Sequence, residues 1–358
     1  RIKFIMAYTT IKKPSDYFDT TTYTGGATDV SSLSFQPDFV WAKKRDGAEN
    51  HGLFDAVRGA TKTLNSNTTS AESTRSGSLT SFDSDGWSMG GSDGIISASG
   101  STYVAWSWSG AGNSGSANTD GDIASTVSAN TTSEFSIVSY TGNGVDLSTT
   151  PQTVGHGLSG VSMVIIKNLS QSIYWIVKQK DLSSNKVLYL NDSSAETTPT
   201  GGNQGHIGNL SSSGTTFELV SNSSNVDNVN VNGNNYIAYC FAEKQGYSKF
   251  GSYVGNGSTD GTFIYTGFKP AFVMTKNITA GSTDWTVCDS KRDGFNDNNK
   301  RLFPNQNSAE SGSNPWQMYS NGFKITTTGS FVNTSGDNFI YMAFAEQPLV
   351  GDNPATAR

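Results

Sequence analysis

Apolar residues alternate along many short segments of this chain. In the segment NYIAYCFAE (235–243), both the even-numbered and the odd-numbered positions are apolar from Tyr236 to Ala242. Successive side chains of a strand point to opposite faces of its sheet, so this strand carries apolar residues on both faces. The pattern predicts a central strand that is buried on both sides.

The same order of segments occurs three times along the chain. Each unit opens with an aromatic strand that ends in a glycine turn, continues with a buried strand that ends on lysine, and closes on a strongly apolar strand. The landmarks of these three strands are Tyr23, Tyr140 and Tyr253, then Lys43, Lys167 and Lys276, and finally Ala105, Ala238 and Ala343.

Short strands punctuated by turns are typical of β-sandwiches and jelly rolls. We therefore predict an all-β fold of three tandem, jelly-roll-like β-sandwich domains built from one repeated unit. Because only a few residues separate the second unit from the third, the first unit is expected to be set apart from the other two. The predicted segments are an N-terminal arm (1–15), repeat 1 (16–110), a Gly/Ser/Asn/Thr-rich linker (111–133), repeat 2 (134–245), repeat 3 (246–348) and a C-terminal tail (349–358).

A Ser-Ala-Glu triplet also recurs in every repeat, ending at Glu72, Glu196 and Glu310. Three active sites would need further reactive residues that recur with it, and no such set is found. The triplet is predicted to form a loop or a short helical turn after a strand, with the glutamate near its start.

Composition narrows the function classes. Charged residues make up 15% of the chain, and 39 glycines accompany many Ser, Thr and Asn, which disfavours helices. A net charge of −6 gives no electrostatic footprint for nucleic acid, and no apolar run is long enough to span a membrane. Neither nucleic-acid binding nor insertion into a membrane is therefore expected. Cys240 and Cys288 are predicted to be buried thiols, with a disulfide between them as the alternative.

Candidate chemistry is sparse, and we predict that the protein is not an enzyme. The three histidines do not align between repeats, and zinc-ligand spacing, a nucleophile elbow and a phosphate loop are missing from the sequence. No cofactor is expected, with calcium left open. The oxygen-rich segment DSKRDGFND supplies Asp289, Asp293 and Asp297 as weak calcium candidates.

Aromatic residues offer a second kind of site. Carbohydrate sites in β-sandwiches combine an aromatic platform with polar loops. Trp316 lies in a predicted loop and is the best candidate for an exposed platform, and Trp106 and Trp108 share one face of the closing strand of repeat 1. Trp175 and Trp285 align with each other on a strand and are predicted to be core residues.

Several long segments together resemble a known family. They include DYFDTTTYTGG, FQPDFVWAKKR, HGLFDAVRGATKTL, YIAYCFAEKQGYSKFGSYVGNG and GFKPAFVMTKN. The chain resembles the repeat-containing virion structural proteins of tailed, marine-type bacteriophages, which include tail-fibre-like and appendage proteins, over residues 16–347. That resemblance brings no catalytic residues with it.

The resemblance implies a structural protein on the exterior of the phage particle, as a tail fibre, an appendage or a capsid decoration. It further implies a homo-oligomer, for which a trimer is plausible, contacts with other virion proteins, and a role in host attachment through surface carbohydrate. Two alternatives stay open from the sequence. One is a bacterial surface adhesin or lectin, and the other is a polysaccharide-degrading tail protein that uses paired carboxylates.

Overall fold

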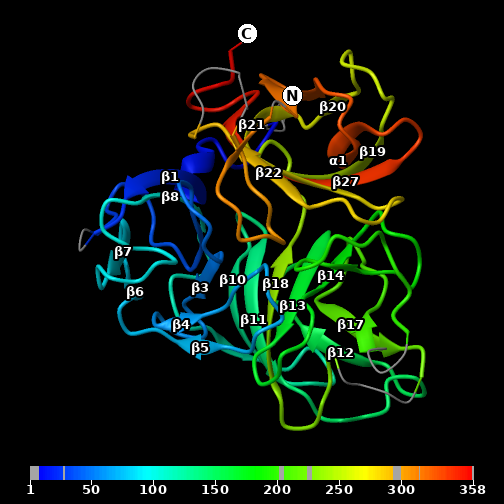
Figure 1. The fold of residues 1–358 in the computed structure, drawn as a ribbon. Helices are drawn as coiled ribbons and strands as arrows, with labels where there is room; N and C mark the ends of the chain where they lie inside the picture. Colours follow the sequence, from blue (N-terminus) through cyan, green and yellow to red (C-terminus); the bar gives the residue numbers. More distant parts are fainter. Residues whose placement is uncertain are drawn as a thin grey trace, which may run out of the picture.

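The protein is an all-β structure in which three groups of sheets surround a common centre (Figure 1). This computed structural model describes residues 8–26, 29–200, 205–223, 228–292, 300–313 and 315–356. In that part of the chain, helical structure is limited to one 3₁₀ turn, η1 (Pro14–Asp16), and one short helix, α1 (Ser330–Asn333). The predicted all-β class is confirmed.

Each repeat contains a main antiparallel sheet with the same strand order. The first strand of the repeat pairs with its last strand, the last pairs with the second, and the second pairs with the third. The strands of repeat 1, in sheet order, are β1 (Phe18–Thr24), β8 (Thr102–Trp108), β2 (Phe39–Lys44) and β3 (Gly52–Asp55). In repeat 2 they are β11 (Phe135–Thr141), β18 (Asn235–Phe241), β13 (Met163–Asn168), β14 (Ile176–Gln179) and the added β15 (Leu188–Tyr189). In repeat 3 they are β19 (Ser248–Val254), β27 (Asn338–Pro348), β21 (Phe268–Asn277) and β22 (Thr286–Asp289).

A smaller sheet covers the outer face of each main sheet. Between the two layers lie separate apolar clusters, such as the one that contains Val40, Phe54 and Trp87 in repeat 1. This arrangement confirms the β-sandwich character of the repeats. The covering strands are β6 (Leu79–Asp83) and β7 (Gly86–Met89), then β12 (Gln152–Gly155), β17 (Thr216–Ser221) and β16 (Gly205–Ile207), and finally β20 (Phe263–Tyr265), β26 (Gly322–Ile325) and β25 (Trp316–Tyr319). Two short ribbons complete the fold, β4 (Lys62–Thr63) with β5 (Ser73–Thr74), and β23 (Lys300–Arg301) with β24 (Ser311–Gly312).

The tyrosine of each first strand makes the same contacts in all three repeats. Its ring stacks on the aromatic residue directly opposite on the closing strand, and its hydroxyl donates to a backbone carbonyl on a loop. The stacked pairs are Tyr23–Tyr103 at 5.3 Å, Tyr140–Tyr236 at 4.9 Å and Tyr253–Phe339 at 5.0 Å, and the acceptors are the oxygens of Ile96, Val229 and Val332.

These pairs also fix the register of the closing strands and correct the sequence alignment. Since Phe339 is equivalent to Tyr103 and Tyr236, the residue equivalent to Ala105 and Ala238 is Tyr341. Ala343 lies two positions further along β27, so the predicted alignment of Ala343 is wrong. A shift of two residues keeps each side chain on the same face, which is why the apolar pattern did not reveal it.

The inner faces of the three main sheets meet in one shared core. At its centre, equivalent residues of the closing strands contact one another: ring centroids lie 6.2 Å apart for Trp108–Phe241, 5.5 Å for Trp108–Phe344 and 6.0 Å for Phe241–Phe344. The same core contains buried residues from every main sheet. Separate tandem domains are therefore not confirmed, and the expectation that repeat 1 stands apart is wrong.

The predicted linker 111–133 is also wrong over much of its length. Residues Ser116–Asn118 (β9) and Ser125–Asn130 (β10) extend the main sheet of repeat 2 beyond β11. The segment holds few apolar residues, but Ile123 and Val127 are both buried in the core of repeat 2. Backbone pairing along the free edge of β11, with two well-placed apolar side chains, is enough to form the strands.

The described ends of the chain pack on repeat 3. Of the predicted arm, residues 1–7 lie outside the described residues, while Ile11 is buried in the shared core. The Tyr8 hydroxyl donates to the backbone oxygen of Gly267 at 2.9 Å. In the predicted tail, the backbone N–H of Asp352 donates to the oxygen of Lys12 at 3.3 Å, so the two ends lie together (Figure 1).

Candidate functional site

The Ser-Ala-Glu triplet connects each repeat to the next. Its glutamate donates its backbone N–H to a carbonyl just after the lysine-ending strand of the neighbouring repeat. The three bonds are Glu72 to Leu169 at 3.0 Å, Glu196 to Ile278 at 3.2 Å and Glu310 to Arg45 at 2.9 Å. They close a ring, from repeat 1 to 2, from 2 to 3 and from 3 back to 1. The triplet lies in loops, as predicted, and its role is to join repeats.

A second closed ring of hydrogen bonds lies beside the first. The residue before the third strand of each repeat donates a side-chain N–H to a backbone oxygen of the preceding repeat. The bonds are Trp175 Nε1 to Asn65 at 2.9 Å, Trp285 Nε1 to Tyr189 at 3.0 Å and His51 Nε2 to Phe303 at 2.9 Å. Trp175 and Trp285 are buried, as predicted.

His51 occupies the place of these tryptophans. Its Nδ1 accepts the indole N–H of Trp41 at 2.9 Å, so Nε2 carries the proton in the neutral ring. Burial lowers the pKa of His51 well below its usual value, which keeps the ring neutral. His51 is thus a structural donor in the ring.

Buried ion pairs reinforce two of the three interfaces. At the interface of repeats 3 and 1, Arg292 Nε lies 2.6 Å from Asp289 Oδ2, and the Trp106 indole donates to the same oxygen at 3.1 Å. At the interface of repeats 1 and 2, Arg58 Nε lies 2.5 Å from Asp55 Oδ2, and the Tyr239 hydroxyl donates to that oxygen at 2.8 Å.

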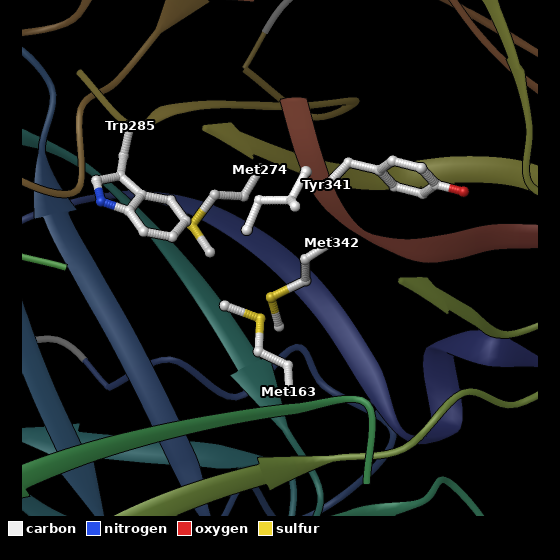
Figure 2. A pocket seen from close by; sticks show the side chains of 6 residues that line it. Met163, Met274, Trp285, Tyr341 and Met342 are labelled. Carbon is white, nitrogen blue, oxygen red and sulfur yellow. The ribbon is translucent and has the colours of Figure 1, made fainter. Parts of the chain in front are cut away.

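Among the described residues, the interface of repeats 2 and 3 has no equivalent of this buried ion pair. Gln179 and Leu182 replace the aspartate and the arginine, and Met342 replaces the donor. Figure 2 shows Met163, Met274 and Met342 converging near Trp285, while the phenol of Tyr341 points away. The three flexible methionine side chains line a small apolar gap at this interface.

A polar groove of about 310 Å³ lies where the N-terminal segment meets repeat 3. Two tyrosines flank it: the hydroxyls of Tyr8 and Tyr265 lie 3.5 Å apart, and Tyr265 is 55% exposed. Burial and the neighbouring Tyr265 raise the pKa of Tyr8 to about 12, so the Tyr8 phenol is a neutral donor at ordinary pH.

Charged groups line the same groove. The Glu243 carboxylate pairs with Lys249, which also lines the groove, and lies 3.3 Å from the ammonium of Lys180. The amide of Gln245 and the hydroxyl of Thr266 are further lining groups. Aromatic rings, a carboxylate, an amide and an ammonium thus meet in one open groove, a set that suits ligands rich in hydroxyls and weakly apolar faces.

Comparison with known protein families identifies the chain. Residues 13–348 match the model of a domain of unknown function, DUF7483. The protein belongs to this family. The match covers the three repeats together, so the DUF7483 domain corresponds to the whole ring. Searches of the curated proteins and of the solved structures return no match.

In this DUF7483 member the three tryptophans predicted as a ligand platform are buried. Trp106 and Trp316 expose 0% of their surface and Trp108 exposes 1%, so none offers a face to a ligand. The exposure prediction is wrong because Trp316 lies on β25, where it pairs with Ile325 of β26 and its ring fills the outer core of repeat 3. Trp106 and Trp108 face the shared core, which the sequence of one repeat does not reveal.

The calcium prediction is not supported at Asp289. Both of its oxygens accept N–H groups, from Trp106, from Arg292 and from the backbone of Lys291. A carboxylate saturated by donors has no lone pairs free for a cation. Asp293 and Asp297 lie outside the described residues.

Two features are absent from the described part of the chain. It contains no group of three or more His, Cys, Asp or Glu arranged to hold a metal ion. None of its helices is long and apolar enough to cross a bilayer. Cys240 and Cys288 are buried thiols that form no disulfide with each other, as predicted.

The residues of the tyrosine groove were missed at the sequence level. Tyr8 and Tyr265 are 257 positions apart, so no local motif joins them. One usable signal exists in Phe263-Ile264-Tyr265, where strand alternation places both aromatic rings on the face opposite the buried Ile264. An exposed pair of aromatics on a short strand marks a candidate binding surface.

The three lysines near the ends of β2, β13 and β21 are buried, and each donates to the backbone oxygen of the residue after it, as Lys167 Nζ does to Asn168 at 2.7 Å. Burial lowers the pKa of Lys167 to about 7 and those of Lys43 and Lys276 to about 8. These values lie below the usual value for lysine in an unfolded chain, so the unfolded state binds more protons above pH 7. Stability therefore rises with pH from about 7 to about 10.5.

We expect Lys167→Met to flatten this rise. One lysine contributes at most about 1.4 kcal/mol per pH unit within that window. Urea unfolding at several pH values measures the slope, and Lys44→Met, a partly exposed lysine at the end of β2, is the control. An unchanged slope in Lys167→Met is the result that contradicts the assignment.

Proposed function

We propose that the protein is a non-enzymatic structural component on the exterior of a tailed-phage particle, and that repeat 3 binds surface carbohydrate through the groove between Tyr8 and Tyr265. Its place on the particle, as a fibre, an appendage or a capsid decoration, and its role in host attachment follow from the sequence resemblance described above. Other virion proteins and further copies of the chain are its proposed partners.

The exposed ring of Tyr265 beside the paired charges of Glu243 and Lys249 carries the carbohydrate part of the proposal. Sugars present apolar C–H faces that stack on aromatic rings and hydroxyls that hydrogen-bond to charged and amide groups. The groove supplies both, and Gln245 adds an amide. Repeat 2 lacks the stacking ring, because the strand position of Tyr265 is taken there by Gly155.

The use of the repeated acidic residues supports a structural rather than an enzymatic role. Glu72 and Glu310 bind arginines at the interfaces, Asp55 accepts from Arg58 and Tyr239, and Asp289 is saturated by donors. These carboxylates stabilise the ring.

Replacing Tyr265 tests the groove. We expect the protein to bind at least one oligosaccharide on a glycan array, and Tyr265→Ala to weaken that binding by about tenfold, because the stacking ring is lost. Phe263→Ala is a matched control, since Phe263 is 44% exposed on the same strand but does not line the groove. Equal weakening by both variants, or no binding to any glycan, contradicts the carbohydrate proposal.

The place on the particle needs a separate measurement. Antibody labelling of purified virions in the electron microscope is expected to show the chain on the outer surface. Absence of the chain from purified particles, with glycan binding intact, favours the adhesin or lectin alternative. Cleavage of a bound polysaccharide by the purified protein contradicts the non-enzymatic proposal.

A further inference from the structure

A second groove, of about 360 Å³, lies at the interface of repeats 2 and 3. This is the interface at which Gln179 and Leu182 replace the buried ion pair. Both repeats contribute residues to the lining of the groove. Asp181, Ser183, Lys186 and Glu196 come from repeat 2, and Ile278 and Thr279 come from repeat 3. Glu196 belongs to the Ser-Ala-Glu triplet of repeat 2.

At the other two interfaces, the equivalent glutamate binds a guanidinium group. Arg45 holds Glu310 with two parallel bonds, from Nε at 2.9 Å and from a terminal nitrogen at 3.0 Å, and Arg292 lies 3.6 Å away. Arg58 lies 3.3 Å from Glu72. At two of the three interfaces, therefore, the glutamate of the Ser-Ala-Glu triplet pairs with an arginine side chain.

The groove lies where those arginines are missing. Leu182 takes the position of Arg58 and Arg292, and Ile278 takes the position of Arg45. Within the described residues, the Glu196 carboxylate accepts hydrogen bonds only from Ser183, from its backbone N–H at 2.9 Å and its hydroxyl at 2.5 Å, and it forms no ion pair. Asp181 adds a second carboxylate to the same groove.

Lys186, which also lines the groove, does not neutralise the carboxylate of Glu196. Lys186 forms no ion pair with a carboxylate of the described residues. Its equivalent in repeat 1, Lys62, lies 3.6 Å from Glu72 although Arg58 already binds that carboxylate. A lysine at this position is therefore compatible with a bound guanidinium.

We infer that the groove between repeats 2 and 3 receives an arginine side chain of another polypeptide, which pairs with Glu196 as Arg45 pairs with Glu310. The planar guanidinium matches a carboxylate with two parallel hydrogen bonds, and a lysine ammonium does not. The partner chemistry is thus an exposed arginine on a protein surface. This inference rests on the comparison of the three interfaces and does not depend on the carbohydrate groove.

Small probes test the pairing on the full chain by NMR. N-acetyl-arginine amide is expected to shift the backbone amide signals of Ser183, Ser252 and Thr279, which line the groove. N-acetyl-citrulline amide has nearly the same shape without the charge, and is expected to leave them unchanged. Equal shifts with citrulline, equal shifts with N-acetyl-lysine amide, or no shifts with the arginine probe each overturn the assignment.

Two variants of opposite design complete the test. Glu196→Gln is expected to weaken binding of the arginine probe by about tenfold, because the charge of the acceptor is lost. The matched control is Glu218→Gln, an exposed carboxylate on β17 of the same repeat. Ile278→Arg places an arginine where repeat 1 has Arg45, and is expected to abolish binding by filling the groove from within. Probe shifts that persist in Ile278→Arg overturn the inference.

Discussion

Trp108→Ala is expected to lower the free energy of unfolding by about 3–5 kcal/mol, as replacements of large buried aromatics by alanine do. The expected loss is large because Trp108 lies at the centre of the shared core, where its ring contacts Phe241 of repeat 2 and Phe344 of repeat 3. The cavity opens where all three repeats meet, so the variant is expected to weaken all three together.

Hydrogen exchange resolved by segment measures this effect. Trp108→Ala is expected to reduce protection in the closing strands of every repeat, β8, β18 and β27. Trp316→Ala removes an equally buried indole from the outer core of repeat 3, and is expected to act mainly on β20, β25 and β26. If the change in Trp108→Ala stays within repeat 1, the repeats are energetically independent and the shared core does not couple them.

Arg292→Leu is expected to cost about 3–5 kcal/mol, because it leaves the carboxylate of Asp289 buried without its cation. Neither side chain is exposed, and their shortest separation is 2.6 Å. Urea unfolding measures the loss. Arg45 still binds Glu310 in this variant, so the effect reports on the buried pair.

The sequence of repeat 2 indicates a second substitution that is expected to restore the stability lost in Arg292→Leu. Its equivalents of Asp289 and Arg292 are Gln179 and Leu182, an uncharged pair that the chain already uses at the same position. The double variant Asp289→Gln/Arg292→Leu is therefore expected to recover most of the loss and to lie within about 1.5 kcal/mol of the natural protein. If the double variant is as unstable as Arg292→Leu, the arginine stabilises the interface through contacts other than its ion pair with Asp289.

The strands of each repeat were largely predictable because they rest on local alternation. Tyr23, Tyr140 and Tyr253 occupy equivalent places, since each must stack on the aromatic residue opposite and reach one loop carbonyl. Such contacts lie within a repeat, and the repetition of the sequence shows them three times.

Contacts between repeats were not predictable in the same way. Trp106 and Asp289 were singled out for different chemistries, and the structure brings them together across an interface at 3.1 Å. Nothing in the sequence around either residue specifies the other. An apolar pattern shows that a residue is buried, and it does not distinguish the outer core of one repeat from the core that three repeats share.

The segment 111–133 shows a second limit. Its composition is that of a linker, yet residues 125–130 pair with β11. Backbone hydrogen bonds to a free sheet edge need no apolar sequence, so composition underestimates such strands. The tyrosine groove was missed for a related reason, because its two rings are 257 positions apart in the chain.

The closed ring of repeats has a consequence for how the protein is made. The core that surrounds Trp108 is completed by Phe344, on the last strand of the fold. While the chain leaves the ribosome, the inner faces of the first two main sheets have no third sheet to cover them. Domains of most multidomain proteins fold one after another during synthesis, whereas this ring closes only after repeat 3 has emerged. The nascent protein therefore exposes aromatic surface late in translation, and its yield in cells is expected to depend on chaperones that bind such surfaces.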